Sequence, residues 1–573
     1  MRKLTLIALS AILVLFLAPV NLMAQDQCFE RIAEIEIPEV DLNTGGIGNV
    51  ISNVDVDGDG MTELYIVNDM WDNVLDGAHE EIPRIYKLEW NGSAWNQVWQ
   101  AVAPVTYQNT WPVLVLTDLD GDGKQELTWA PANNFTEEAN PYRILVYEHE
   151  GGSSDNFGVA DGDAFKPNSM WAFPAEDNVN VRPMHGAAAD IDDDGKQEFL
   201  FADRKGGNGG YYFGICSVSD VPDDGDGSET WTMETSGLDH PLPDGINNKW
   251  TVAVLGSNAY FFSETEISKV SWDGSAYTYA ALAPLEGGFP NQSAEVVDID
   301  GDGTEEIIIA VYDDAGVGDD AKKAILLLQE NGANDLTRTT LVNINMYFDS
   351  RGAWGSTSGD VDGDGNLDFI FGSRGGTDVN VAQIFRLAYR GGDITDPNNY
   401  VFSTIDKNYD SDAGAGAGVW SIVSLANVDS DEALEVIYGS SVPYGGDLFN
   451  PDATKPMVVL DYTCEPGSDP VLSIAQTGTV VDGYKLSQNY PNPFNPTTTI
   501  AFEVPSDELI TLTVYNMLGH EVATLVNENL SQGAYEVTWS GKDKIGNIVP
   551  AGAYIYQLKA GNTIKVRKMT YIK

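Results

Sequence analysis

Short segments in which apolar and polar residues alternate recur along this chain. Residues 84–90 and 95–99 form one pair of such segments, and residues 266–272 and 277–279 form another. Alternation with a period of two is typical of β-strands that bury one face and expose the other. The pattern therefore predicts a chain that is built from short, half-buried strands.

A nine-residue acidic motif accompanies these strands. In its first copy, at residues 55–63, positions 1, 3, 5 and 9 are acidic and positions 4 and 6 are glycine. Carboxylate and carbonyl oxygens are the ligands that Ca²⁺ prefers, and the glycines allow the tight turn that brings them together. The spacing is not that of an EF-hand, whose glutamate stands at position 12 of the loop. The motif predicts a calcium site formed by Asp55, Asp57, Asp59, the carbonyl of Met61, and Glu63.

The motif returns four times with good agreement, and once more, at residues 427–435, without either glycine. Acidic loops that bind no metal are the alternative, but so many converging carboxylates would repel one another without a cation. We therefore predict five strong Ca²⁺ sites and one weak site. The further ligands, with position 7 acting through its carbonyl, would be Asp118, Asp120, Asp122, Lys124 and Glu126; Asp190, Asp192, Asp194, Lys196 and Glu198; Asp298, Asp300, Asp302, Thr304 and Glu306; Asp360, Asp362, Asp364, Asn366 and Asp368; and Asn427, Asp429, Asp431 and Glu435.

The spacing of the motifs predicts the architecture. Copies begin at residues 55, 118, 190, 298, 360 and 427, and the longest interval, 298 − 190 = 108 residues, contains a further unit without aspartates. Its first two strands are expected at residues 250–256 and 259–262. Units of roughly 60 residues with four strands are typical of the blades of a β-propeller. We predict an all-β protein, with a seven-bladed β-propeller over residues 25–466 and a small β-sandwich after it.

The two ends of the predicted ring are far apart in the sequence. The last unit supplies three strands, the third near residues 456–462, and lacks a fourth, while residues 31–37 have no unit of their own. If these two segments pair antiparallel, Cys28 lies beside Cys464, and we predict a disulfide between them. Closing so long a loop contributes on the order of 4–5 kcal/mol in the chain-entropy model. The third cysteine, Cys216, lies in an apolar segment and is expected to be a buried free thiol.

The N-terminus and the charge indicate an exported protein. Residues 1–24 have a basic start, a long apolar stretch and a small-residue cleavage site, which predicts a signal peptide. No later segment approaches the length of a membrane-spanning helix. The chain of 573 residues has a net charge of −56, which argues against nucleic acid and anionic membranes as partners. We expect the mature protein to work outside the cell, where calcium is plentiful.

The repeated units, over residues 28–465, resemble the FG-GAP or VCBS repeats of integrin-α-type seven-bladed propellers. The resemblance lies in the Asp-x-Asp-Gly-Asp-Gly loop between the first two strands of a blade. It implies that the loops bind calcium on the face opposite the usual ligand surface, so that the calcium is structural. The chain departs from the family in its fourth unit, which has no acidic loop, and in its seventh, whose loop is degenerate.

A polar linker is predicted at residues 467–485, and alternating segments after it are typical of a small β-sandwich. Residues 486–573 closely resemble the type A C-terminal sorting domain of the type IX secretion system. This resemblance implies a didermic bacterium, with the type IX secretion machinery as a partner and with release or surface anchoring after export. A carbohydrate-binding sandwich is the alternative. The matching segments are residues 486–496, 514–519, 550–556 and 568–573.

A ligand is expected at the mouth of the central channel, where loops from every blade converge. Aromatic rings there could stack on sugars or hold a peptide, so the sequence predicts a binding or adhesion module for a glycan or a surface protein. The alternative is that these aromatic side chains pack between blades as core. The predicted ligand-binding residues, which stand at the starts of innermost strands, are Trp111, Trp250, Trp354 and Trp420.

An enzyme is the second hypothesis, and no catalytic residue is assigned. The five histidines share no repeat position, and the chain has no Gly-x-Ser-x-Gly or His-Glu-x-x-His motif. A calcium-dependent polysaccharide lyase would need a base and a cationic group, for which His185 with Arg182 or Arg351 are the candidates. A structural component of a surface layer is the third hypothesis.

Overall fold

The computed structural model describes residues 26–572 in part, and the chain is nearly all-β, with short 3-10 turns at Gly237–Asp239 (η3) and Pro397–Asn399 (η5). Within the described residues, no helix has the length and apolar character needed to cross a membrane. The predicted signal peptide lies outside them. The longer stretches outside the described residues are 1–25, 36–44, 71–82, 105–111, 132–141, 241–247, 313–322, 345–352, 375–382, 408–418, 440–456 and 468–474.

Seven sheets, each with at least four antiparallel strands, form the described part of residues 26–462, together with a small hairpin. The hairpin pairs β9 (Val159–Asp161) with β10 (Ala164–Lys166). The sheets, from the first strand outward, are β2 (Gly45–Val54), β3 (Thr62–Met70), β4 (Arg84–Trp90) and β5 (Trp95–Val102); β6 (Val113–Thr117), β7 (Glu126–Ala130), β8 (Ile144–Glu148) and β11 (Ser169–Trp171); β12 (Pro183–Ala189), β13 (Glu198–Asp203), β14 (Phe213–Val218) and β15 (Trp231–Ser236); β16 (Thr251–Leu255), β17 (Asn258–Phe262), β18 (Ile267–Trp272) and β19 (Tyr277–Leu282); β20 (Phe289–Val297), β21 (Glu306–Tyr312), β22 (Ala324–Glu330) and β23 (Leu336–Asn343); β24 (Ala353–Gly359), β25 (Asp368–Arg374), β26 (Gln383–Tyr389) and β27 (Tyr400–Lys407), with β28 (Val419–Trp420) paired to β25; and β29 (Ile422–Ala426), β30 (Glu435–Gly439), β31 (Met457–Tyr462) and β1 (Phe29–Ile35).

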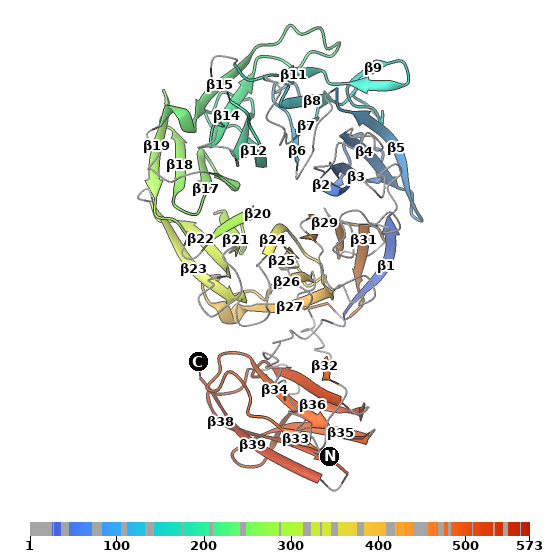
Figure 1. The fold of residues 1–573 in the computed structure, drawn as a ribbon, viewed down its shortest axis with the longest axis vertical. Coiled ribbons are helices and arrows are strands. Elements are labelled where there is room, and N and C mark those ends of the chain that lie inside the picture. The colour runs from blue at the N-terminus through green and yellow to red at the C-terminus, as the bar shows by residue number, and fades with distance from the viewer. Residues whose placement is uncertain are drawn as a thin grey trace, which may run out of the picture.

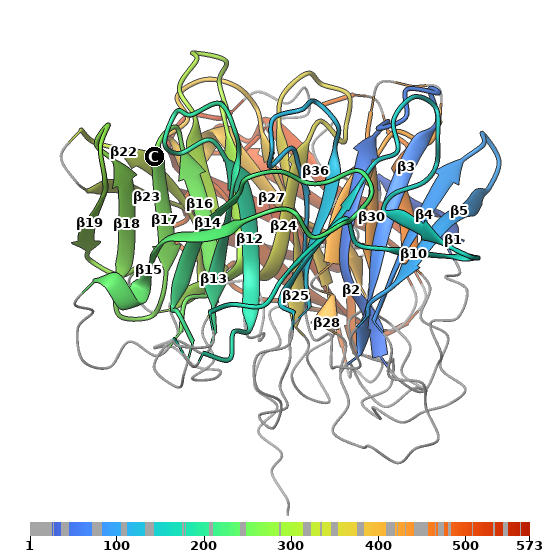
Figure 2. The same cartoon turned by 90° about the horizontal axis from the view of Figure 1, so that it is seen from above.

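The sheets stand side by side around a common centre (Figure 1). The first strand of each sheet is innermost and contacts the innermost strands of both neighbouring sheets, in the closed order β2, β6, β12, β16, β20, β24, β29 and back to β2. The view from the side shows the strands running between the two faces of this ring (Figure 2). Apolar clusters lie between adjacent sheets, and one of them joins Ile308 and Ile325 to Phe369 and Phe385. Each sheet is thus held by packing against its neighbours.

Neighbouring sheets cover the middle strands on both faces. All residues of β7 and β8 are buried, and so are the five inner residues of β4. The prediction of a half-buried strand is therefore wrong for β4. Its polar residues Lys87 and Glu89 are buried because they form an ion pair, with Lys87 Nζ 2.8 Å from Glu89 Oε1. In such a strand, polar and apolar residues still alternate between the two faces, but both faces are buried, one against apolar side chains and one against ion pairs.

The unit without an acidic motif forms a complete sheet, β16 to β19. Its first two strands, β16 and β17, lie in the segments predicted from the sequence and are joined by a tight turn at Gly256, whose φ is 52°. A short turn is sufficient here because an antiparallel pair needs only a few residues to reverse direction.

The N-terminal strand completes the last sheet, which we call the closing sheet (β29, β30, β31 and β1). Strand β1 pairs antiparallel with β31, with Phe29 opposite Tyr462. The Sγ atoms of Cys28 and Cys464 are bonded, and the Cα atoms of the two cysteines are 5.2 Å apart. The beginning and the end of the ring are thus joined both by strand pairing and by a covalent bond.

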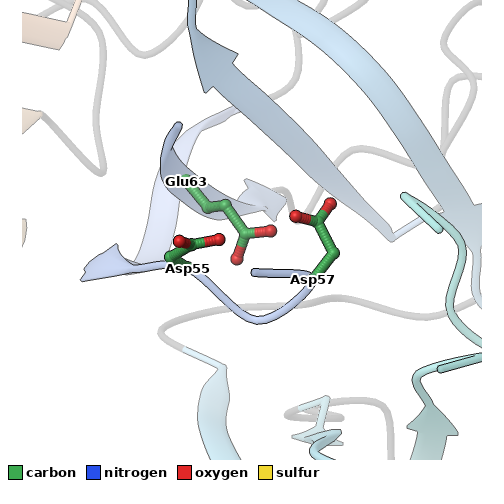
Figure 3. Close-up of side chains that lie close together, drawn as sticks. All are labelled: Asp55, Asp57 and Glu63. Atoms are coloured by element: carbon green, nitrogen blue, oxygen red, sulfur yellow. The ribbon is translucent and has the colours of Figure 1, made fainter. Parts of the chain in front are cut away.

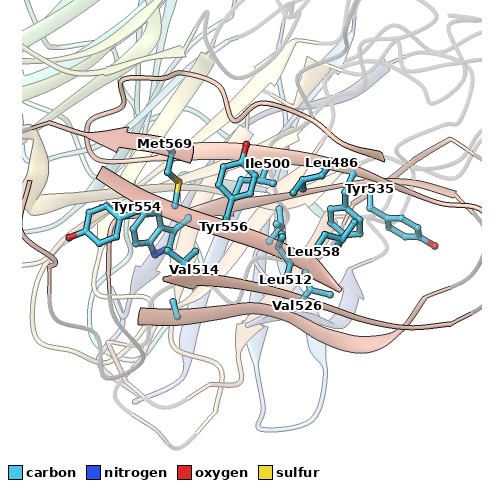
Figure 4. Packing of buried hydrophobic residues seen from close by; sticks show 14 of the residues in the cluster. Leu486, Ile500, Leu512, Val514, Val526, Tyr535, Tyr554, Tyr556, Leu558 and Met569 are labelled. Atoms are coloured by element: carbon cyan, nitrogen blue, oxygen red, sulfur yellow. The ribbon is translucent and has the colours of Figure 1, made fainter. Parts of the chain in front are cut away.

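The tail folds as two four-stranded sheets that enclose their own apolar core (Figure 4). Residues 475–478, which the sequence analysis assigns to the linker, form a strand that pairs with β37, because an edge strand can be held by main-chain hydrogen bonds without apolar alternation. The core contains Leu512, Val514 and Tyr556, all fully buried. The sheets are β32 (Ala475–Gly478), β37 (Gly533–Trp539), β34 (Thr498–Val504) and β33 (Lys485–Leu486); and β36 (Glu521–Leu530), β35 (Glu508–Asn516), β38 (Gly552–Ala560) and β39 (Thr563–Tyr571).

Candidate metal-binding loops

Six acidic loops join the first strand of a sheet to its second strand, and hydrogen bonds connect two neighbouring pairs of them. The amide of Asp118 donates to the side chain of Gln197 (2.9 Å), and the amide of Leu434 donates to the carbonyl of Asp360 (3.0 Å). Such contacts place the loops at the same end of their sheets. We number them in chain order as loop 1 (residues 55–63), loop 2 (118–126), loop 3 (190–198), loop 4 (298–306), loop 5 (360–368) and loop 6 (427–435).

The same hydrogen bonds shape the loops. In all six, the carboxylate at position 9 accepts from the amide of position 2, at 2.6–3.3 Å. The carboxylate at position 5 accepts from the amide of position 7 in all six, at 2.7–2.9 Å. In loops 1 to 5 the carboxylate at position 1 also accepts from the amide of position 6, at 2.8–3.4 Å. The loops therefore share one frame that draws their acidic side chains together.

The acidic side chains converge within this frame. In loop 1, oxygen atoms of Asp55, Asp57 and Glu63 lie within 4.8 Å of one another (Figure 3). Oxygen atoms from positions 1, 3 and 5 form groups of the same size in loops 2 and 3. At position 7, the side-chain nitrogens of Lys124 and Lys196 hydrogen-bond to Glu148 and to the carbonyl of Ser219, outside the nine-residue motif, and Lys124 Nζ also lies 3.6 Å from Asp122 Oδ2. Clustered carboxylate and carbonyl oxygens are the donor set that calcium prefers.

Loop 3 has an aspartate where four other loops have glycine. Asp193 has a φ of 60°, and Gly58, Gly121, Gly301 and Gly363 have φ of 68–75° at the same position. This left-handed conformation costs a residue with a side chain about 1 kcal/mol or more. Because Asp193 is exposed, Asp193→Gly is expected to raise the free energy of unfolding by about 0.5–1 kcal/mol, measured by urea unfolding.

The reverse change in loop 1, Gly58→Asp, is the matched control for this prediction. It is expected to lower the free energy of unfolding by a similar amount, because the φ of Gly58 is 70°. A stabilising Gly58→Asp, or an Asp193→Gly variant less stable than the parent, would contradict the strain argument.

A buried lysine lies beneath loop 1. The Nζ atom of Lys87, whose side chain is fully buried, lies 2.7–3.0 Å from carboxylate oxygens of Asp57, Glu63, Glu89 and Asp155. Burial alone would lower the pKa of Lys87, but hydrogen bonds to Glu63, Glu89 and Asp57 raise it above its usual range. Burial also raises the pKa of Glu89 to about 7. The lysine therefore places a permanent positive charge beside two of the predicted calcium ligands.

Two arginines place positive charges beside the predicted calcium ligands of loop 5. Arg386 is fully buried, with its Nε 2.8 Å from Asp368 Oδ1 and a second nitrogen paired with Asp362. The Nη1 atom of Arg390 lies 2.7 Å from Asp362 Oδ2 and 2.8 Å from Asp364 Oδ2. Positions 3, 5 and 9 of loop 5 are thus paired with cations of the protein itself.

Lys87 and Arg386 occupy the same place in their sheets. Lys87 lies opposite Tyr65, and Arg386 lies opposite Ile370, and each of these opposed residues follows position 9 of its loop by two residues. In the other four sheets with an acidic loop, the residue at this place is apolar, and no internal cation can reach the loop from there. These residues are Val146, Ile215, Leu327 and Val459.

The remaining loops contain buried carboxyl groups that lack a counter-charge of this kind. Burial raises the pKa of Glu126 and Glu198 to about 8 and that of Glu435 to about 7. One carboxylate oxygen of Glu435, in loop 6, is also buried without a hydrogen-bond partner. A bound cation would satisfy such oxygens and favour the charged carboxylates. The residues present therefore fit calcium, which the side chains at positions 1, 3, 5 and 9 and the carbonyl at position 7 would hold.

The tryptophans predicted at the channel mouth are buried where the structure describes them. Trp250 is 7% exposed and Trp354 is 3% exposed, and the indole nitrogen of Trp354 donates to Gln292 (2.9 Å). Trp111 and the side chain of Trp420 lie outside the described residues. The predicted ring of exposed aromatics is not formed at Trp250 and Trp354. The ring of Trp250 stacks on Phe289 of β20, with centroids 4.5 Å apart, and Trp354 hydrogen-bonds to Gln292 of the same strand, as the core alternative expects.

Of the residues in the lyase hypothesis, the structure describes His185 and Arg182. The Nδ1 atom of His185 lies 3.1 Å from the carbonyl of Val252, and burial lowers the pKa of His185 to about 4. Arg182 is buried. Arg351 lies outside the described residues. His185 is thus half-buried and Arg182 is buried, so neither is an exposed group.

A cavity of about 530 Å³ lies beside loop 3, where β15 faces the β18–β19 hairpin. The rings of Trp272 and Tyr277 line it with their centroids 5.0 Å apart, and the Tyr277 hydroxyl donates to Glu234. Glu234 and Asp192 line it too, and their oxygen atoms lie within 4.8 Å of each other and of Glu198. No pattern in the sequence predicts this site, because its residues come from different sheets and only the Trp272–Tyr277 pair is close in the sequence.

Together, the fold and the site define a nearly all-β protein with a ring of four-stranded sheets, repeated acidic loops and a separate two-sheet tail. A family model described as the FlgD Ig-like domain matches residues 491–563, within the tail. No curated protein matches the chain in sequence.

Solved structures with a similar arrangement share little sequence with this chain. A mutant of AofleA from Arthrobotrys oligospora is 12% identical, with a TM-score of 0.35, covering 70% of this chain and 96% of that chain. PorZ of Porphyromonas gingivalis is described as an essential surface component of the type IX secretion system. It is 12% identical, with a TM-score of 0.23, and the match covers 92% of this chain and 81% of PorZ. The NanB sialidase from Streptococcus pneumoniae is 10% identical, with a TM-score of 0.34, and the match covers 75% of this chain and 70% of the sialidase. Likeness at this level carries no conclusion about what this chain binds.

Proposed function

We propose that the chain is a calcium-stabilised, seven-bladed β-propeller that acts outside the cell as a binding or adhesion module. The observation that carries the proposal is the hydrogen-bond frame shared by the six loops, since it brings acidic side chains together at the same point of successive sheets. Calcium bound there would offset part of the net charge of −56 and fix the first two strands to one another in each of the six sheets that carry a loop. Its role is structural, as the resemblance to FG-GAP repeats implies.

We place the ligand in the cavity beside loop 3 and propose that it is a glycan. The rings of Trp272 and Tyr277 are half-buried and offer flat faces on which a sugar ring can stack. Asp192 and Glu234 supply acceptors for sugar hydroxyls. Its volume of about 530 Å³ is within the range of small-molecule sites.

We also propose that the tail is a type IX sorting domain that carries the propeller through the outer membrane of a didermic bacterium. The support for this is the resemblance of residues 486–573, together with the separate two-sheet fold of the tail. After export the propeller would be released or anchored at the cell surface.

The first test is thermal unfolding of the full chain in excess Ca²⁺, in Mg²⁺ and in EDTA. One site at about one hundred times its Kd contributes about 2.7 kcal/mol, so the loss of several sites is expected to lower the Tm strongly in EDTA. Mg²⁺ is the matched control, because its small octahedral shell fits these loops poorly and should give little protection. Equal melting in Ca²⁺ and EDTA would overturn the calcium proposal.

The second arm of the test is a glycan array probed in Ca²⁺. Trp272→Ala is expected to weaken binding by about 2 kcal/mol, the usual cost of removing a central aromatic contact. Tyr490→Ala, at a tail residue that is 70% exposed, is the control and should bind as the parent does. Undiminished binding by Trp272→Ala would contradict the proposal that the glycan binds in this cavity.

A further inference from the structure

A row of acidic residues crosses three strands of the closing sheet. Glu30 on β1 lies opposite Asp461 on β31. The pairing of Val436 with Leu460 places Glu435 of β30 on the other side of Asp461. Directly opposed residues of antiparallel strands have their side chains on the same face of the sheet. Glu30, Asp461 and Glu435 therefore stand side by side, each on a different strand.

Two of these carboxylates have an oxygen atom that is buried without a partner. Glu435 is 1% exposed, and its Oε2 accepts from the amide of Val428 (2.6 Å), which points the side chain into loop 6. Its Oε1 accepts no hydrogen bond, and neither does the buried Oδ1 of Asp461. A buried, unsatisfied carboxylate oxygen is costly, and opposed like charges destabilise a sheet. The row therefore needs a positive charge.

Other sheets provide that charge from within the protein. The equivalent acids of the sheet with loop 1 are Glu63 and Glu89, and both pair with Lys87. In the sheet with loop 2, Lys124 pairs with Glu148, which occupies the place of Asp461. Among the described residues, none of the ion pairs formed by lysine or arginine includes Glu435, Asp461 or Glu30. The closing sheet thus has the acids of these sites without their internal cation.

We propose that the closing sheet binds a divalent cation, with calcium as the fitting ion, between Glu435 and Asp461, with Glu30 at its edge. The proposal rests on the calcium function proposed above and adds two ligands, Asp461 and Glu30, that lie outside the nine-residue motif. Loop 6 has the poorest motif of the six, yet its sheet contains a row of three acids that no internal cation pairs with in the described residues. Because Glu30 belongs to β1, the cation ties the N-terminal strand to the rest of the ring.

The cation and the disulfide secure the same strand. Cys28 precedes Glu30 by two residues, and Cys464 follows Asp461 by three. Without the cation, repulsion along the row would loosen β1 from β31 and open the Cys28–Cys464 bond to reductants. The rate of disulfide reduction is therefore a local measure of cation binding in this sheet.

The test follows reduction of the disulfide by dithiothreitol in the full chain, with alkylation and mass spectrometry of Cys28 and Cys464. Ca²⁺ at about ten times its Kd is expected to slow reduction about tenfold relative to EDTA. Asp461→Asn is expected to lose this protection in Ca²⁺ and to be reduced more slowly than the parent in EDTA, because one repelling charge is gone. Glu30→Gln, at an exposed position, is expected to lose part of the calcium protection and to be reduced slightly more slowly than the parent in EDTA. It replaces Asp461→Asn in the test if that variant does not fold.

Asp298→Asn, in loop 4, separates local from global effects. It is expected to lower the Tm in Ca²⁺ and to keep the calcium protection of the disulfide. If Asp298→Asn loses the protection as Asp461→Asn does, protection follows overall stability and the closing site is overturned. It is also overturned if Ca²⁺ raises the Tm but Asp461→Asn keeps full protection. If Ca²⁺ alters neither Tm nor reduction rate, the calcium function itself fails.

Discussion

Replacement of Lys87 by methionine is expected to lower the free energy of unfolding in EDTA by about 3–5 kcal/mol. The ammonium group is fully buried and contacts four carboxylates at 2.7–3.0 Å. Methionine fills much the same volume but has no charge, so Asp57, Glu63 and Glu89 would be left buried and close together. Removing one partner of a buried ionic group is costly because the uncompensated charges remain.

The loss should be much smaller in saturating Ca²⁺. Asp57 and Glu63 are predicted calcium ligands as well as partners of Lys87, so a bound ion would replace part of the lost positive charge. Urea unfolding of parent and variant in both conditions measures the difference. Lys166→Met is the matched control. Its ion pair with Asp161 is exposed, with 62% and 57% of the two side chains accessible, and its loss should cost less than about 1 kcal/mol in either condition. An equal loss for Lys87→Met in Ca²⁺ and EDTA would show that lysine and metal do not share these carboxylates.

The buried cations are the part of the candidate site that the sequence does not predict. The acidic motif, its repetition and the strands on either side of it are local features, and strands form where the alternating segments predict them. Lys87 lies in such a segment, between Tyr86 and Leu88, and the alternation assigns it to a solvent-facing side. In the structure a second sheet and loop 1 cover that side. The partners of Lys87 are up to 155 − 87 = 68 residues away, and no local pattern reveals them.

The candidate ligand site was missed for the same reason. Spacing from the acidic loops places Trp354 correctly at the start of an innermost strand. The spacing does not predict which neighbouring sheet covers the indole ring of Trp354. In the structure, the indole nitrogen donates its hydrogen bond to Gln292 of the adjacent sheet. The cavity lined by Trp272 and Glu234 likewise depends on how two sheets pack. Sequence periodicity specifies the faces of each sheet, whereas the sites lie between sheets.

Removal of the Cys28–Cys464 disulfide by the paired change Cys28→Ser and Cys464→Ser is expected to lower the free energy of unfolding by about 2–5 kcal/mol. The bond closes a sequence separation of 436 residues, so the unfolded chain gains much freedom without it. Urea unfolding in Ca²⁺ measures the change. Cys216→Ala is the control. Its thiol is free and buried, and it donates to the carbonyl of Phe199, so its loss should cost only about 1 kcal/mol.

The size of this loss should depend on calcium, because the disulfide is one of several contacts that hold β1. The other contacts are its pairing with β31 and, in our proposal, the cation beside Asp461. When the cation is present, β1 keeps its place without the covalent bond, and the paired serine variant loses less stability. In EDTA the same variant retains only strand pairing against the repulsion of Glu30, Asp461 and Glu435, so its loss should be larger. Equal losses in Ca²⁺ and EDTA would mean that the ring is closed by the disulfide and strand pairing alone.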